Sequence, residues 1–145
     1  MGRTMAWRTE GRLNVVVHSS ASPTNLEWAR FLNDIRPHAD GTLRVLVVSH
    51  GGGPDGAQRR ALAETFPNRD RRMPVAVVTA SVLVRGIVAA VHWFNPHIKA
   101  FGMDQMPEAC RFLDLTPEER ALVISLRAEL ERKLADESMR AMPGA

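Results

Sequence analysis

The chain has 145 residues, of which 45% are hydrophobic and 24% charged, with a formal net charge of +3. These values are typical of one soluble globular domain, and the single cysteine, Cys110, excludes an internal disulfide and a cysteine-rich zinc site. No apolar run reaches the roughly 18 residues of a membrane span, and the N-terminal segment lacks the apolar stretch of a secretory signal. We therefore expect a cytoplasmic protein that does not enter a membrane, and the modest charge does not favour nucleic acid as a partner.

The first half of the chain predicts a hairpin followed by alternating helices and strands. A turn signal at Glu10-Gly11-Arg12 separates the first two strands, and a valine-rich run forms the second. Apolar residues at helical spacing mark the helices. In chain order, the expected elements are strand Met5–Arg8, strand Leu13–His18, helix Asn25–Ile35, strand Leu43–Val48 and helix Asp55–Phe66.

The second half continues the alternation. The helix Val82–Phe94 is apolar nearly all round, so we expect it to be the most buried helix, with Trp93 in the core. A threonine cap and a proline begin the last helix. In chain order, the expected elements are strand Pro74–Thr79, helix Val82–Phe94, an edge strand His97–Phe101, helix Met106–Leu113 and helix Pro117–Ser138.

This alternation predicts an α/β fold, with a small mixed or parallel sheet of four to five strands and crossover helices. We expect one domain over residues 1–145, with its core at about 5–115 and an added amphipathic helix at about 117–138. That helix repeats a leucine every four residues, which predicts either a cover for the sheet or a homodimer contact. The leucines are Leu122, Leu126, Leu130 and Leu134.

The loop after Val48 carries two catalytic patterns. Residues Gly51–Gly56 match the G-x-G-x-x-G pattern of dinucleotide-binding loops, and His50–Gly53 read like the oxyanion loop of esterases. However, no acidic residue ends the next strand to bind a ribose, and the chain has no G-x-S-x-G nucleophile elbow. We therefore expect no catalytic residues, no cofactor and no enzymatic activity.

Other polar residues offer weaker candidates. Ser81 and Arg85 stand four residues apart at a helix start, where they predict either an anion site or a simple helix cap. Arg59 and Arg60 open a basic run that reaches Arg72, which is either an attractive surface for an anionic partner or a solvated face. The five histidines lack clear carboxylate partners, so we expect no metal site.

Four features resemble the STAS, or SpoIIAA-like, family: the hairpin with Glu10-Gly11-Arg12, the strand Val45–Ser49, the strand PVAVVT at residues 74–79 with its apolar helix, and the ending IKAF…PEACRFL. The resemblance spans roughly residues 5–115. It implies a non-enzymatic binding module of four or five strands with helices mainly on one side. In the branch of anti-sigma-factor antagonists, a serine or threonine after the central strand is phosphorylated, and Ser49 is the residue that carries over. The usual Asp-Ser-Ser/Thr-Gly is replaced here by Ser49-His50-Gly51-Gly52-Gly53.

The sequence thus predicts a regulatory module that binds a protein partner through the loop Ser49–Gly56 and the helix start at Ser81, edged by Arg59 and Arg60. One alternative is a small-ligand, lipid or anion/nucleotide-binding protein that uses the same loop. Another is a dimer through the last helix. Strand order stays open, because STAS-like and flavodoxin-like sheets share this alternation.

Overall fold

The computed structural model describes residues 2–38, 42–66 and 73–141. Within these residues five strands form one sheet in the order β1-β2-β3-β4-β5, with β1 antiparallel to β2 and the other neighbours parallel. The strands are β1 (Met5–Glu10), β2 (Leu13–His18), β3 (Arg44–Ser49), β4 (Val75–Thr79) and β5 (Ile98–Phe101). The helices are α1 (Asn25–Ile35), the short 3₁₀ helix η1 (Arg36–His38), α2 (Gly56–Thr65), α3 (Val82–Phe94), α4 (Met106–Phe112) and α5 (Pro117–Ala141).

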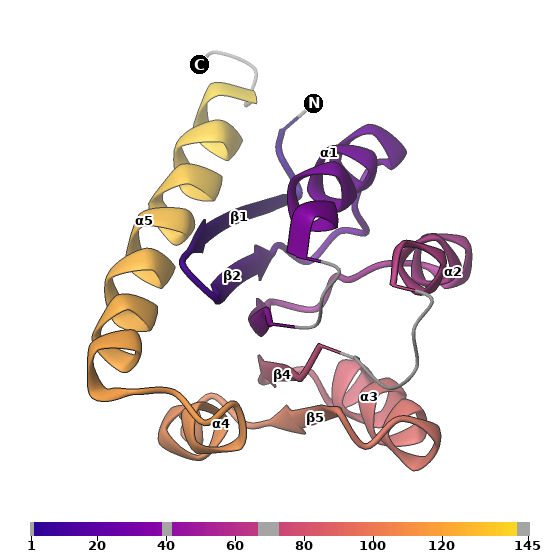
Figure 1. The fold of residues 1–145 in the computed structure, drawn as a ribbon. Coiled ribbons are helices and arrows are strands. Elements are labelled where there is room, and N and C mark those ends of the chain that lie inside the picture. The colour runs from indigo at the N-terminus through magenta and orange to yellow at the C-terminus, as the bar shows by residue number, and fades with distance from the viewer. Residues whose placement is uncertain (1, 39–41, 67–72, 142–145) are drawn as a thin grey trace.

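The α/β class and the mixed sheet are confirmed, and the sheet order adds what the sequence left open. Each described strand lies beside the one before it, so the order never reverses. A flavodoxin-like sheet, with its order 2-1-3-4-5, is therefore excluded. Right-handed crossovers that always advance in one direction place their helices on the same face. Figure 1 shows α1, α2 and α3 on that face and α4 and α5 on the other.

On the first face, α1 and α2 pack against the sheet and against each other. The aromatic rings of Trp28 and Phe31 lie 5.2 Å apart, and the Trp28 indole N–H donates to the carbonyl oxygen of Gln58, 2.8 Å away. The Thr24 side chain caps α1, while Glu27 bonds back to the Thr24 N–H. The Trp28 hydrogen bond fixes α1 against α2, and the edge-to-face contact between the Trp7 and Phe31 rings, 5.6 Å apart, joins α1 to the hairpin. The buried core of this face comprises Met5, Val16, Trp28, Phe31, Leu32, Ile35, Leu43, Val45 and Met73.

On the second face, α5 runs along the hairpin strands and its apolar row is buried against them. Val123, Leu126, Leu130 and Leu134 belong to one core cluster with strand residues such as Val15 and Val17. The alternative of a homodimer through the leucine row is therefore not supported, because the sheet already covers these side chains. The resemblance implied helices mainly on one side, whereas α4 and α5 cover the second face. Cys110 also lies in this core, as expected, and burial raises the pKa of its thiol.

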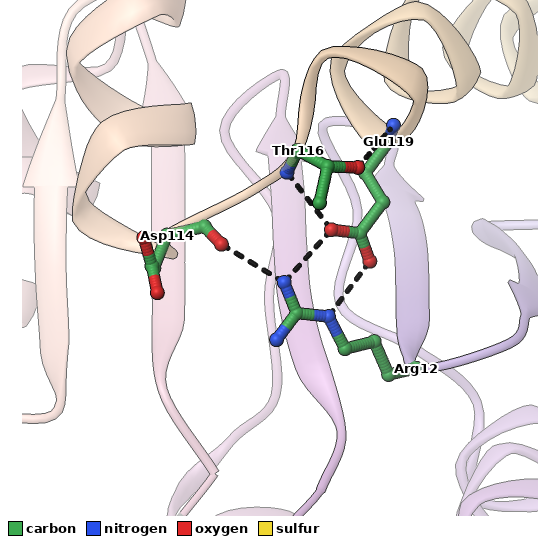
Figure 2. Close-up of polar contacts among 4 residues, drawn as sticks. All are labelled: Arg12, Asp114, Thr116 and Glu119. Carbon is green, nitrogen blue, oxygen red and sulfur yellow. Dashed lines mark hydrogen bonds and ion pairs between the residues drawn. The ribbon is translucent and has the colours of Figure 1, made fainter.

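The start of α5 is attached to the hairpin turn by one arginine (Figure 2). The Arg12 guanidinium binds both carboxylate oxygens of Glu119 at 2.8 Å and also donates to the Asp114 carbonyl oxygen at 2.9 Å. Glu119 forms a capping box with Thr116, and Asp114 has a positive φ of 55°. The hydrogen bonds from Arg12 lower the pKa of Glu119 to about 2. One cation thus holds the cap of α5 and the turn that precedes it.

The helix α3 is the least covered of the crossover helices, and the prediction that it is the most buried is wrong. Among its side chains that the structure describes, only Val88 is buried, and Trp93 is 84% exposed. The reason is topological. β5 is the last strand of the sheet, so α3 packs on β4 and β5 at the border, and its outer side extends beyond the sheet.

Candidate functional site

The carboxyl ends of the three central strands bring together a row of buried polar residues. His18, Ser49 and Thr79 are neighbours in the strand register, and all three are at most 3% exposed. The Thr79 hydroxyl donates to the Ser49 carbonyl oxygen at 2.8 Å and accepts from the Ser81 N–H at 3.0 Å. Ligand sites of α/β proteins commonly lie at this end of a sheet, so the free groups here decide what the site can do.

The Ser49 hydroxyl forms its hydrogen bonds within its own loop. Its hydroxyl donates to the Gly52 carbonyl oxygen at 2.6 Å and accepts from the Gly51 N–H at 3.1 Å, and the residue is 1% exposed. A kinase or a partner protein reaches this oxygen only if the loop opens. The regulatory role of Ser49 stays a prediction, and in this conformation its hydroxyl closes the turn at the end of β3.

The glycine loop is a packed turn. The Gly52 N–H donates to the Ser19 carbonyl oxygen at 2.8 Å, and a Cβ at Gly52 would lie 2.1 Å from the Ala21 carbonyl oxygen. Gly51 has a φ of +120°, a conformation that side-chain-bearing residues rarely adopt. The N–H groups of Gly51 and Gly52 both have acceptors within the chain, so neither is free to bind an anion.

Two backbone N–H groups at the start of α2, shortly after Gly53, also have acceptors within the chain. The Asp55 carboxylate accepts from the Gln58 N–H at 2.8 Å, and the Gln58 side chain accepts from the Asp55 N–H at 2.9 Å. An acidic cap at this helix start repels a phosphate. The Arg59 guanidinium donates to the Pro54 carbonyl oxygen, and Arg60 is exposed. The end of the basic run, residues 67–72, lies outside the described residues.

The two histidines of the strand ends have different roles. His50 is partly exposed, and its Nε2 lies 2.6 Å from the Glu131 carboxylate, which ties β3 to α5. His18 is buried, so desolvation lowers its pKa to about 4, and its Nδ1 has no hydrogen-bond partner among the described residues. No group of three or more metal-binding side chains gathers anywhere in the described ranges.

Ser81 caps α3. Its hydroxyl accepts from the Val84 N–H at 3.2 Å, which is one of the two roles that the sequence predicted. Arg85 is exposed one turn further along the helix. The structure therefore shows the capping role of Ser81, and an anion site at Ser81 and Arg85 stays a prediction.

An apolar surface on α3 is the feature that sequence reasoning missed. Val82, Leu83, Ile87 and Trp93 are 81%, 72%, 42% and 84% exposed. Four side chains of this size leave on the order of 500 Å² of apolar surface in water, a size that is often functional on a monomer. The sequence carries the signal for this surface as a helix almost without charges, a pattern that also predicts burial within the chain. We call these four residues, with the exposed Gly86, Ala89 and Ala90 between them, the α3 face.

The edge strand beside the α3 face is partly closed to strand pairing. The Ile98 N–H donates to the Asn95 carbonyl oxygen at 3.3 Å, and the Ile98 carbonyl oxygen lies 2.6 Å from His92 Nδ1. A carbonyl oxygen can only accept, so Nδ1 carries the proton. Because both backbone groups of Ile98 are already bonded within the chain, an added strand could not pair with this residue.

A shallow hollow on the opposite face lies between α4 and α5. Its volume is about 340 Å³, and its lining is largely apolar. Ile124, which is 70% exposed, borders it. The other lining residues are Met106, Val123, Arg127, Ala128 and Glu131.

Comparison with known proteins found no matching family model, curated protein or solved structure. Within the ranges that the structure describes, none of the helices combines the length and the hydrophobicity that crossing a bilayer requires.

Proposed function

We propose that the chain is a cytoplasmic, non-enzymatic regulatory module of the STAS-like kind, and that it binds another protein through the α3 face. The observation that carries this proposal is the exposure of α3. Its outer side holds apolar side chains, whereas the solvent side of a crossover helix is normally polar. A second protein that covers this side removes the apolar surface from water.

The size of the surface sets what such a partner must provide. At about 25 cal/mol per Å², covering roughly 500 Å² contributes on the order of 12 kcal/mol. Association costs an estimated 4–15 kcal/mol in lost freedom of motion. The two values are similar, so the α3 face supplies the centre of an interface. Polar contacts around it must supply the remaining affinity.

The glycine loop at the carboxyl end of β3 favours protein binding over nucleotide binding. A phosphate site at a glycine loop needs free backbone N–H groups and an uncapped helix start. Here the N–H groups of Gly51 and Gly52 bind acceptors within the chain, and Asp55 caps α2. The sheet order also lacks the reversal at which α/β sheets form their ligand crevice.

A second candidate function is the binding of a small apolar or lipid-like ligand in the hollow between α4 and α5. Its volume of about 340 Å³ lies at the lower end of the range for ligand sites. Ile124 offers the hollow an exposed apolar side chain. This candidate places the ligand on the face of the sheet opposite to α3, so a variant on one surface does not disturb the other.

The two surfaces permit a matched experiment. Tagged wild-type protein, Leu83→Glu and Ile124→Glu are used as baits in an extract of the source cells, and captured proteins are identified by mass spectrometry. Each captured protein is then purified and its affinity for the three baits is measured by calorimetry. Leu83 and Ile124 are both about 70% exposed, so neither charge enters the core.

We expect a purified partner to lose at least about tenfold in affinity for Leu83→Glu and little for Ile124→Glu, since a charge at the centre of an apolar interface leaves it unpaired. Equal affinity for wild type and Leu83→Glu would contradict the proposed function. Binding of a fatty acid that only Ile124→Glu abolishes would favour the ligand candidate instead.

A further inference from the structure

The α3 face carries no charged side chain at its centre. An α-helix has 3.6 residues per turn, so Val82, Gly86, Ala90 and Trp93 fall within about a quarter of its circumference. Arg85 lies outside this arc, about 60° beyond Val82 around the helix. A contact between two identical surfaces sets each residue against its neighbours from the other copy, which is unfavourable where the surface is charged. The α3 face avoids this cost.

The spacing of large and small side chains along α3 is complementary to itself. If two α3 helices lie antiparallel with their midpoint at the level of residue 88, Leu83 of each copy faces Trp93 of the other. Gly86 then faces Ala90. The bulky pairs thus form the two ends of the contact and the small pairs form its middle, which lets the helices approach closely.

Gly86 itself has no explanation within the chain. A Cβ at this position would meet no atom within 4 Å, and glycine in a helix interior is less stable than alanine. The middle of an antiparallel helix pair provides a physical reason, because the missing side chain leaves room for the facing helix.

The area agrees with a dimer. Two α3 faces of the order of 500 Å² together bury about 1,000 Å², which is the lower limit of a specific interface. The apolar row of α5 is already buried against the sheet, and Ile98 closes part of the β5 edge. We propose that a second copy of this chain covers the α3 face, with the two α3 helices antiparallel across a two-fold axis. This inference rests on the proposed function, since it identifies the first partner of the same surface, and another protein would bind there in competition with it.

Sedimentation velocity over low micromolar to several hundred micromolar protein tests the inference. We expect wild type to shift from the monomer mass of 16.1 kDa to twice that mass as concentration rises. Leu83→Glu should stay monomeric, and Ile124→Glu should behave as wild type. The emission of Trp93 should shift to shorter wavelength over the same range, since the exposed indole becomes buried, and Trp93→Phe identifies its share of the signal. Circular dichroism checks that each variant is folded.

A wild-type chain that stays monomeric throughout would overturn the inference, and so would a dimer that Leu83→Glu leaves intact. Flotation with phosphatidylcholine vesicles that Leu83→Glu abolishes would also overturn it, because the face would then enter a bilayer. If the chain stays monomeric but binds a different purified protein through Leu83, the dimer is ruled out and the proposed function stands. If the chain dimerises through α3 but binds no other protein, the dimer stands and the proposed regulatory function fails.

Discussion

Gly52 lies where the glycine loop meets the loop after β2, and the contact is too close for a side chain. A Cβ there would lie 2.1 Å from the Ala21 carbonyl oxygen, whereas a Cβ at Gly53 would meet nothing within 4 Å. We predict that Gly52→Ala lowers the free energy of unfolding by roughly 3 kcal/mol, because backbone must shift, and that Gly53→Ala changes it little. Urea unfolding measures both variants. Equal stability of the two would show that the loop is not packed as described.

His18 is the residue that should make stability depend on pH. Its pKa is about 4 in the folded chain and 6.5 when unperturbed, so between these values the unfolded state binds a proton that the folded state does not. The free energy of unfolding should therefore fall as the pH falls from 6.5 to 4, by roughly 3 kcal/mol in total. The nearby carboxylate of Glu27 is present in wild type and in the His18 variant alike, so it does not account for a difference between them.

Urea unfolding at several pH values in this window tests the assignment to His18. The variant His18→Leu should remove most of the slope between pH 6.5 and 5, because the titrating group is gone. A variant with the wild-type slope would assign the effect to other groups.

The burial of the Ser49 hydroxyl could not be predicted from the sequence. The sequence places a serine after a strand and before three glycines, and that pattern alone permits an exposed hydroxyl. Its burial depends on the close approach of Gly52 to Ser19 and Ala21, residues that lie about thirty positions earlier in the chain. Such contacts between loops have no local signal, whereas the caps at Thr24 and Ser81 follow from residues within one helical turn and were predictable.

At the scale of elements, Arg12 is the main polar link between the hairpin and α5. It binds the Glu119 carboxylate with two nitrogens, and Glu119 is largely buried, whereas the Arg8–Glu129 pair joins the same elements with both side chains over 40% exposed. We predict that Arg12→Ala lowers the free energy of unfolding by about 1–2 kcal/mol and that Arg8→Ala lowers it by less than about 1 kcal/mol.

Three measurements check the role of Arg12. Urea unfolding gives the stabilities, and hydrogen exchange should become faster in the first turn of α5 only in Arg12→Ala. The pKa of Glu119, followed by carbon NMR, should rise from about 2 toward its usual 4.5 in the same variant. An unchanged pKa would show that Arg12 is not the partner that lowers it.

The elements themselves were largely predictable, but their exposure was not. Valine runs and turn residues located the strands to within one or two residues, because these signals are local. The burial of α3 was predicted wrongly, since an apolar helix looks the same in sequence whether its own chain or another protein covers it. The position of β5 at the sheet border leaves the outer side of α3 uncovered. For the leucine row of α5 the sequence left a dimer contact open, whereas the hairpin strands of the same chain cover it.

For the whole molecule, the two faces of the sheet differ in how fully their helices are buried. The face of α4 and α5 joins residues from both ends of the described chain into one core. The face of α1, α2 and α3 is well packed at α1 and ends at α3 with apolar side chains in water. Strand order, which produces this difference, depends on pairings between distant segments and could not be obtained from alternation alone.

We propose that another protein molecule covers the α3 face. Incorporation of a photoreactive amino acid in place of Leu83, in living cells, tests it most directly. We expect irradiation to give cross-linked species of higher mass, either a dimer or a complex with a different protein. The same amino acid at Ile124, which is equally exposed on the opposite face, should give much less. Absence of cross-links at Leu83, or equal yields at the two positions, would contradict the account.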